Sequence, residues 1–364
     1  MEADKKRLIE FDYAKTLAIL FMVIIHVVEE LSNVEVYETL PKGMLENIIQ
    51  FGAGPLAAPQ FMLAMGVGVV FSRYHDPRSL FRRGVRLLLL GLALNIGRDV
   101  IPRLLAAAVS GTGPNWENLY FQIFNIDILH FAGLAMMFTA LLKALRVPVL
   151  ALIPIGVILQ AAGNWLALLT VPKGGAAEAV CSYFFYTGEL SSFPLLNWYI
   201  IMAAGLVGGE LLLTARKVND SDRFFLACFI GGAGLLAGIV STCLYYRIDI
   251  RNFYALYNDW LYKQTFFHFL FNACIIAVEL SAFHFLCRHG SKCDGFASFC
   301  GVNLNTIYII QWMIIGWLAS FKDLLKLDLS LNMSVVVGIV IAFISIGITR
   351  LLPRIRLTGH RDPK

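Results

Sequence analysis

The 364-residue chain has few charged residues: only 15% are Asp, Glu, Lys or Arg, whereas soluble globular chains carry about 25%. It also lacks a hydrophilic stretch long enough for a sizeable soluble domain, because apolar runs of about 20 residues recur along its length. The hydrophobic content of 58% and the mean hydropathy of +0.69 therefore predict an integral membrane protein. Lys and Arg gathered at one membrane face account for the net charge of +5, so no nucleic-acid partner is expected.

Cysteine is scarce and odd in number, with seven residues that lie mostly in apolar segments, and we predict no disulfide framework. His284, Cys287, His289 and Cys293 lie close together in the sequence. Their spacing matches no standard zinc pattern, so no metal is expected. The first apolar run is too long for the core of a signal peptide and no small-residue cleavage site follows it, so no cleavable signal peptide is predicted.

Ten segments are long enough to cross the membrane as helices. Backbone polar groups in lipid must be satisfied internally and no strand-like alternation is present, which favours helices. Most of the 30 Lys and Arg residues fall in alternate loops, which predicts that both termini are cytoplasmic. We therefore predict an all-α polytopic bundle, a single domain over residues 1–364 with a helical core at about 12–351. The predicted spans are 12–32, 52–73, 84–108, 125–145, 148–170, 193–215, 224–246, 264–287, 297–320 and 331–351, with Pro55 and Pro59 breaking the second and Pro102 the third.

Lys15 and His26 are the most informative pair in the chain, because both lie in the first apolar run. They are 11 positions apart, which places them on one face of a helix and about 16 Å apart along its axis. An ionisable side chain inside a membrane is costly to keep and usually marks a functional site. The pair therefore indicates chemistry or transport within the membrane.

Glu29 and Glu30 follow His26 by three and four positions, one helical turn away. Either carboxylate could accept a hydrogen bond from one imidazole nitrogen, which would fix the tautomer and leave the other nitrogen as a base. The alternative is a histidine satisfied between helices, with both glutamates in the outer headgroup zone. With Lys15 on the same face, we favour the functional interpretation.

Two arginines stand at the start of the third span, in the segment Arg83-Gly84-Val85-Arg86. They share a helix face at the predicted cytoplasmic edge, and guanidinium groups bind phosphates bidentately, so they could hold a phosphorylated cofactor. Ordinary positive-inside anchoring and contact with anionic lipid are the alternatives. Further along the same span, Arg98 and Asp99 are expected to pair with neighbours.

Together these motifs resemble the acyltransferase-3 family of integral membrane acyltransferases. The spacing of Lys15 and His26 is similar to the basic-x10-His signature of that family's first helix, and Arg83–Arg86 resembles its R-x-x-R motif. The stretch from Ala58 to Gly66 resembles its second helix, where a Pro and a Phe precede a Gly. The resemblance covers the chain from Arg7 to about Arg350.

Two later segments refine the resemblance. The stretch from Asp127 to Leu134 is more similar to the related heparan-α-glucosaminide N-acetyltransferase-like proteins of the same superfamily. The stretch from Asn303 to Trp312 resembles a late helix of the superfamily, with Gln311 standing where many acyltransferase-3 members have a histidine.

The resemblance implies transfer of an acetyl or other acyl group from cytosolic acetyl-CoA to a hydroxyl or amine of a sugar, a glycan or a similar acceptor, usually on the outer side of the membrane. Lys15, Arg83 and Arg86 would hold the acetyl-CoA, and His26, assisted by Glu29 and Glu30, would be the base or would carry the acyl group itself. Polar residues of the spans could line the acceptor pocket, although each also fits a helix–helix hydrogen bond. These are Asn95, Asp127, His130, His268, Asn272 and Asn305.

The expected partners are acyl-CoA, the acceptor and membrane lipids, in the cell membrane of a bacterium. A homodimer is compatible with the resemblance, because related proteins include dimers. The alternative function is a proton-coupled secondary transporter, since broken helices and intramembrane His and Glu also serve proton coupling. The chain shows no internal repeat of the kind that transporters carry, and acetyl-CoA binding would distinguish the two.

Overall fold

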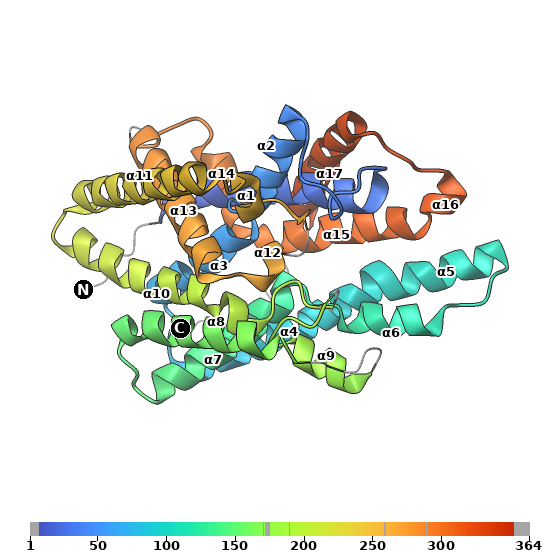
Figure 1. Ribbon diagram of the computed structural model, residues 1–364, viewed down its shortest axis with the longest axis horizontal. Helices are drawn as coiled ribbons and strands as arrows, with labels where there is room; N and C mark the ends of the chain where they lie inside the picture. Colours follow the sequence, from blue (N-terminus) through green and yellow to red (C-terminus); the bar gives the residue numbers. More distant parts are fainter. Residues whose placement is uncertain are drawn as a thin grey trace, which may run out of the picture.

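In a computed structural model the chain is almost entirely helical (Figure 1). The structure describes residues 7–169, 171, 175–188, 190–257, 260–288 and 290–352. Over these residues, extended pairing is limited to two isolated bridges, Ser32 with Leu329 and Ile126 with Ser191. The helical elements are α1 Ile9–Leu31, α2 Met44–Ala53, α3 Ala58–Phe71, α4 Pro77–Asn95, η1 Ile96–Val100, α5 Ile101–Ser110, α6 Trp116–Phe124, α7 Ile128–Ala144, η2 Val149–Ala151, α8 Leu152–Leu166, α9 Ala176–Ser182, α10 Leu195–Lys217, α11 Ser221–Tyr246, η3 Ile250–Phe253, α12 Trp260–Lys263, α13 Phe266–Leu286, α14 Asp294–Val302, α15 Leu304–Ser320, α16 Lys322–Leu325 and α17 Leu331–Leu351.

Local signals in the sequence explain several helix ends. Asp76 caps α4 by accepting a hydrogen bond from the Ser79 amide at 2.9 Å, and Pro77 occupies the first helical turn, where its missing N–H is tolerated. The third predicted span therefore begins earlier than expected. Pro102 also falls in a first turn, because one turn of π-helix, η1, precedes α5. The break expected near Pro55 is confirmed, since α2 ends at Ala53 and α3 begins at Ala58.

Every predicted span coincides with a helix or a pair of adjoining helices. Seven of the described helices, counting adjoining pairs once, are long and apolar enough to cross a membrane, or eight if the bent pair α14–α15 is one span. That pair bends by 74° between Val302 and Leu304. Helix α7 has fewer residues than the length criterion for a span requires, and α4, which carries several arginines in its first turns, is not among the candidate spans. The all-α polytopic bundle is thus confirmed, whereas the count of ten and the side of each terminus stay predictions.

The helices form two groups, which lie above and below the middle of Figure 1. The lower group contains α4 to α10, and the upper group contains α1, α2, α11 and α13 to α17. Helix α1 contacts α2, α3, α13, α14, α15 and α17, so it is central to the upper group. Helix α3 contacts both α1 and α10 and connects the two groups.

Glycines allow the closest helix contacts. A Cβ atom at Gly66 of α3 would collide with the Met202 carbonyl oxygen, and one at Gly205 of α10 would collide with the Leu63 carbonyl oxygen. Such close approach of backbones replaces the hydrophobic driving force that is missing between helices in lipid. Helix η1 is pressed against α15 in the same way, through Gly316. These contacts set the distance between the two groups, and the cavities described next lie between them.

Candidate active site

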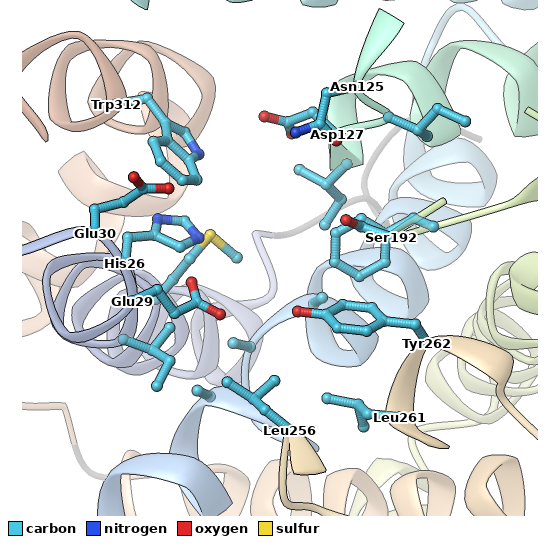
Figure 2. Close-up of a pocket in the computed structure, with 18 of the residues that line it drawn as sticks. His26, Glu29, Glu30, Asn125, Asp127, Ser192, Leu256, Leu261, Tyr262 and Trp312 are labelled. Carbon is cyan, nitrogen blue, oxygen red and sulfur yellow. The ribbon is translucent and has the colours of Figure 1, made fainter. Parts of the chain in front are cut away.

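Two cavities lie side by side between the helix groups. The first, which we call the His26 cavity, has a volume of about 220 Å³. Figure 2 shows His26, Glu29 and Glu30 on one wall of this cavity. Asp127 and Tyr262 lie on the facing wall. The first wall comes from α1, whereas Asp127 precedes α7 and Tyr262 belongs to α12, so packing of distant segments creates the cavity.

The imidazole of His26 lies between an amide and an indole. Its Nδ1 atom is 3.4 Å from Oε1 of Gln311, and its ring stacks on Trp312 with centroids 3.9 Å apart. When Nδ1 carries the proton and donates to Gln311, Nε2 keeps a lone pair that can accept another proton. The structure thus places Gln311, rather than Glu29 or Glu30, at this nitrogen. Gln311 occupies the position where many acyltransferase-3 members have a histidine.

Glu29 is held by the loop that follows α1. The hydroxyl of Tyr37 donates a hydrogen bond to its carboxylate at 2.6 Å. Burial raises the pKa of Tyr37 well above its usual value, so the phenol stays protonated and remains a donor. Glu30 lines the same cavity. Both glutamates therefore lie in the same cavity as His26, although the imidazole bonds Gln311 instead of the expected Glu29 or Glu30.

A buried ion-pair network forms the part of the cavity wall next to His26. Arg98, in the π-helical turn, donates from Nε to Asp99 at 2.8 Å and from Nη1 to Asp127 at 2.7 Å. The hydroxyl of Tyr308 also donates to Asp127. The Arg98 guanidinium lies 4.2 Å from the Trp312 ring centroid. His26 stacks at a similar distance, so the two must cover opposite faces of the indole. π-Helical turns inside α-helices are frequent at functional sites.

The second cavity, which we call the Lys15 cavity, has a volume of about 430 Å³. Its walls are mainly apolar, and Lys15, Arg83 and Asn305 supply polar groups. None of the described residues that line it is a carboxylate. Within the described part of the chain, Lys15 and Arg83 form no ion pair, because Asp12 pairs with Arg7 at 2.5 Å instead of with Lys15. Two cations that form no ion pair therefore face one space, which is the property of an anion-binding site.

The two cavities adjoin each other. Ile128 and Tyr308 line both of them. Along one face of α15, Asn305 lines the Lys15 cavity, Tyr308 lines both and Trp312 lines the His26 cavity. Lys15 and His26, which the sequence predicts on one face of α1, are arranged in the same way: Lys15 lines the Lys15 cavity and His26 lines the His26 cavity. A ligand in one cavity can thus meet a ligand in the other at Tyr308.

The remaining predicted site residues lie outside both linings. Arg86 is exposed on α4, and Asn95 donates to the carbonyl groups of Ile123 and Asn125. Nδ1 of His130 accepts from the Asp127 amide, which completes the cap of α7. These contacts join helices and loops, which is the alternative that the sequence left open for Asn95 and His130.

The two predicted residues of α13 have similar surroundings. His268 bonds the Thr265 hydroxyl at 2.7 Å and the Asn252 carbonyl at 3.2 Å. The Asn272 amide donates to the side chain of Gln264 at 3.4 Å. Both side chains hold the start of α13 against the preceding loop, away from the two cavities.

Residues that the sequence analysis did not assign complete the site. Arg98 and Asp99 pair as expected, but their place beside His26 depends on packing between distant helices. For α15, the sequence offered one signal: Asn305, Tyr308 and Trp312 are spaced at i, i+3 and i+7, which places the three side chains on one face of an apolar helix.

Of the cysteine and histidine cluster, His289 lies outside the described residues. Across the residues that are described, no three His, Cys, Asp or Glu side chains group as a metal site requires.

Residues 7–237 match the family model for the heparan-alpha-glucosaminide N-acetyltransferase catalytic domain. No curated protein matches the chain. The match includes Lys15, His26, Arg83 and Asp127, whereas α15 follows it in the chain. It confirms the predicted superfamily but does not extend to the acyltransferase-3 family itself. With more than half of its length matched, the chain belongs to the heparan-alpha-glucosaminide N-acetyltransferase catalytic family, a family of N-acetyltransferases, and its long apolar helices are those of a multi-pass membrane protein.

Proposed function

We propose that the protein transfers an acetyl group from acetyl-CoA to an amine or hydroxyl of a sugar or glycan. The observation that carries the proposal is the pair of adjoining cavities with different charge. One presents the unpaired cations Lys15 and Arg83, and the other presents His26 among carboxylates. A two-substrate transfer needs both substrates held at once, with their reacting atoms in contact.

The Lys15 cavity suits the donor. Lys15 and Arg83 would bind phosphate groups of CoA, since ammonium and guanidinium groups are the usual phosphate ligands of proteins. The apolar walls, which include Phe61, Met62 and Met65, would enclose the pantetheine arm. The thioester would then point towards Tyr308 and the His26 cavity. Arg86 lies outside this lining and would act from the entrance.

The His26 cavity suits the acceptor. Its aromatic side chains, such as Trp198 and Tyr262, offer flat faces for a sugar ring. Asp99 and Asp127 are paired with Arg98, so the other charged side chains of this lining are Glu29, Glu30 and Arg103. The two glutamates outnumber the one arginine and would attract a cationic group. An amino sugar meets both conditions, which is consistent with the N-acetyltransferase name of the family.

His26 has two roles that fit its geometry. As a general base, Nε2 would take the proton of the attacking amine or hydroxyl while Gln311 holds Nδ1–H. As an acyl carrier, Nε2 would itself attack the thioester and pass the acetyl group on. Both roles need the neutral imidazole and the tautomer that Gln311 favours.

The orientation of the bundle extends the proposal to the two sides of the membrane. Lys15 and Arg83 lie at the end of the bundle that the positive-inside rule predicts to be cytoplasmic, where acetyl-CoA is available. His26 lies towards the opposite end, where a glycan outside the cell could enter. The expected location is the cell membrane of a bacterium, with surrounding lipids and a second copy of the chain as further partners.

Acetyl-CoA binding to the detergent-purified protein tests the proposal. We expect acetyl-CoA to raise the melting temperature saturably, because a ligand that binds only the folded state stabilises it. Lys15→Ala/Arg83→Ala should lose this shift. Arg82→Ala, on the same helix but outside both linings, is the matched control and should retain it. A well-folded wild type with no shift at millimolar acetyl-CoA would contradict the proposal and favour the transporter.

A further inference from the structure

Tyr308 lies where the two cavities adjoin, so its polar side chain can reach a substrate in either cavity. Among the described residues, the two cavity linings share just Ile128 and Tyr308. Ile128 is apolar, so the Tyr308 hydroxyl is the one polar side-chain group of the described chain at the junction. The residue is buried, with 6% of its surface exposed. In the proposed function, a thioester that extends from the Lys15 cavity towards His26 would pass Tyr308.

Neighbouring residues fix the orientation of the Tyr308 ring and hydroxyl. The hydroxyl donates to Oδ1 of Asp127, and the ring meets His26 edge-on with centroids 6.5 Å apart. One turn further along α15, Trp312 stacks on His26. The phenol is thus pre-oriented beside the imidazole, and little reorganisation is needed when charge develops there.

Asp127 can release the Tyr308 hydroxyl without being left unpaired. Its Oδ2 atom keeps the ion pair with Arg98 at 2.7 Å, and its Oδ1 atom keeps the hydrogen bond from the Leu129 amide at 3.3 Å. The hydroxyl can therefore turn from Asp127 to a second acceptor while the buried carboxylate stays compensated. Arg98 differs from Tyr308, because its Nε and Nη1 groups bond two carboxylates and it lines only the His26 cavity.

We propose that Tyr308 is a catalytic residue whose hydroxyl donates a hydrogen bond to the oxyanion of the acetyl-transfer intermediate. The proposal rests on the proposed function. The ammonium group of the acceptor first gives one proton to Glu29 or Glu30. The free amine nitrogen then attacks the thioester carbonyl carbon, and the carbonyl electron pair moves onto oxygen, where Tyr308 stabilises it. His26 takes the proton from the acceptor. The intermediate then collapses, the C–S bond breaks, and the CoA sulfur leaves with the bonding pair and receives that proton.

Tyr308→Phe tests this role in the full-length protein. The assay follows CoA thiol release from acetyl-CoA with glucosamine as the probe acceptor. We expect kcat to fall about 10²–10³-fold, the usual cost of removing an oxyanion donor. The KM for acetyl-CoA should stay within about twofold, because the hydrogen bond forms only in the transition state.

The matched control is Tyr199→Phe. Tyr199 is a buried tyrosine of α10 that hydrogen-bonds Thr139 and lines neither cavity. The control loses the same hydroxyl and one buried hydrogen bond, and its kcat should remain at the wild-type value.

A double-mutant cycle separates a catalytic role from one that acts only through Asp127. If the hydroxyl contacts the oxyanion, Tyr308→Phe should lower kcat by a similar factor in an Asp127→Asn background. If Tyr308 merely holds Asp127, its effect should vanish there. Because Asp127→Asn removes a charge from the Arg98 ion pair, the acetyl-CoA-dependent thermal shift of each variant must first show that it is folded before the kcat values are compared.

The outcomes distinguish the two proposals. A wild type that turns over acetyl-CoA, with a Tyr308→Phe variant equal to it in kcat, would overturn the role of Tyr308 alone. A rise in KM at unchanged kcat would also overturn it, since that marks ground-state binding. A wild type that neither binds acetyl-CoA nor releases thiol would overturn the proposed function, and the role of Tyr308 with it.

Discussion

The ion-pair network around Arg98 leads to the sharpest prediction about stability. Arg98→Met keeps a long side chain that can pack on Trp312 but removes the charge between Asp99 and Asp127. The Arg98 and Asp127 side chains are only 5% and 3% exposed, so water cannot replace the lost partner. Breaking one member of a buried ion pair costs about 3–5 kcal/mol, because the other charge stays buried without compensation. We expect a loss of that size in the free energy of unfolding.

The measurement is unfolding in mixed micelles, with helicity followed as the fraction of denaturing detergent increases. The control is Arg223→Met, whose partner Asp220 lies 3.5 Å away in a pair with side chains 85% and 40% exposed. Exposed pairs contribute about 0.2–1 kcal/mol, so this variant should stay close to wild type. If the unfolding free energy of Arg98→Met also falls by less than about 1 kcal/mol, water reaches the ion pairs. The description of a buried ion-pair network beside His26 would then be wrong.

Two further predictions concern His26 and the contact between α3 and α10. His26→Ala should lower the rate of acetyl transfer at least about 10²-fold. The variant should keep the acetyl-CoA-dependent thermal shift, because His26 does not line the Lys15 cavity. Transfer at the wild-type rate by a folded variant would rule out both roles proposed for the imidazole. Gly205→Ala should cost about 1–3 kcal/mol in unfolding free energy, since its Cβ would collide with the Leu63 carbonyl oxygen. Gly208→Ala on the same helix meets no atom within 4 Å and should be neutral or slightly stabilising, and equal losses in the two variants would contradict the contact described for α3 and α10.

Periodicity within single helices predicted much of the architecture. The spacing of Lys15 and His26 implied one face of α1, and the structure has each residue lining one of two adjoining cavities. The prolines near residue 55 implied the break before α3, which the structure contains. In each case the information is local, because helical geometry alone converts sequence separation into position.

The rest of the site depends on contacts between residues far apart in the sequence. Arg98, Asp127 and Tyr308 meet only because η1 and the start of α7 pack against α15. No periodicity in one segment determines which turn of another segment it will touch. For the same reason Arg83 and Arg86 were equivalent in sequence, although only Arg83 lines a cavity in the structure. The partner of His26 also differed from the expected glutamates, because Gln311 reaches Nδ1 from another helix.

The two cavities carry different sets of charged side chains, which supports the proposal that each cavity binds one of the two substrates. A single mixed cavity would let the Lys15 ammonium pair with Glu29 or Glu30, and the anion site would be lost. Tyr308 and Ile128 line both cavities, and Lys15 and Arg83 line one whereas Glu29 and Glu30 line the other. In the proposed function, the cations would bind phosphates and the glutamates would attract a cationic acceptor. In a low-dielectric interior such unpaired groups are costly to keep. Retaining both sets is therefore best explained by two ligands of opposite charge, which meet at the hydroxyl of Tyr308.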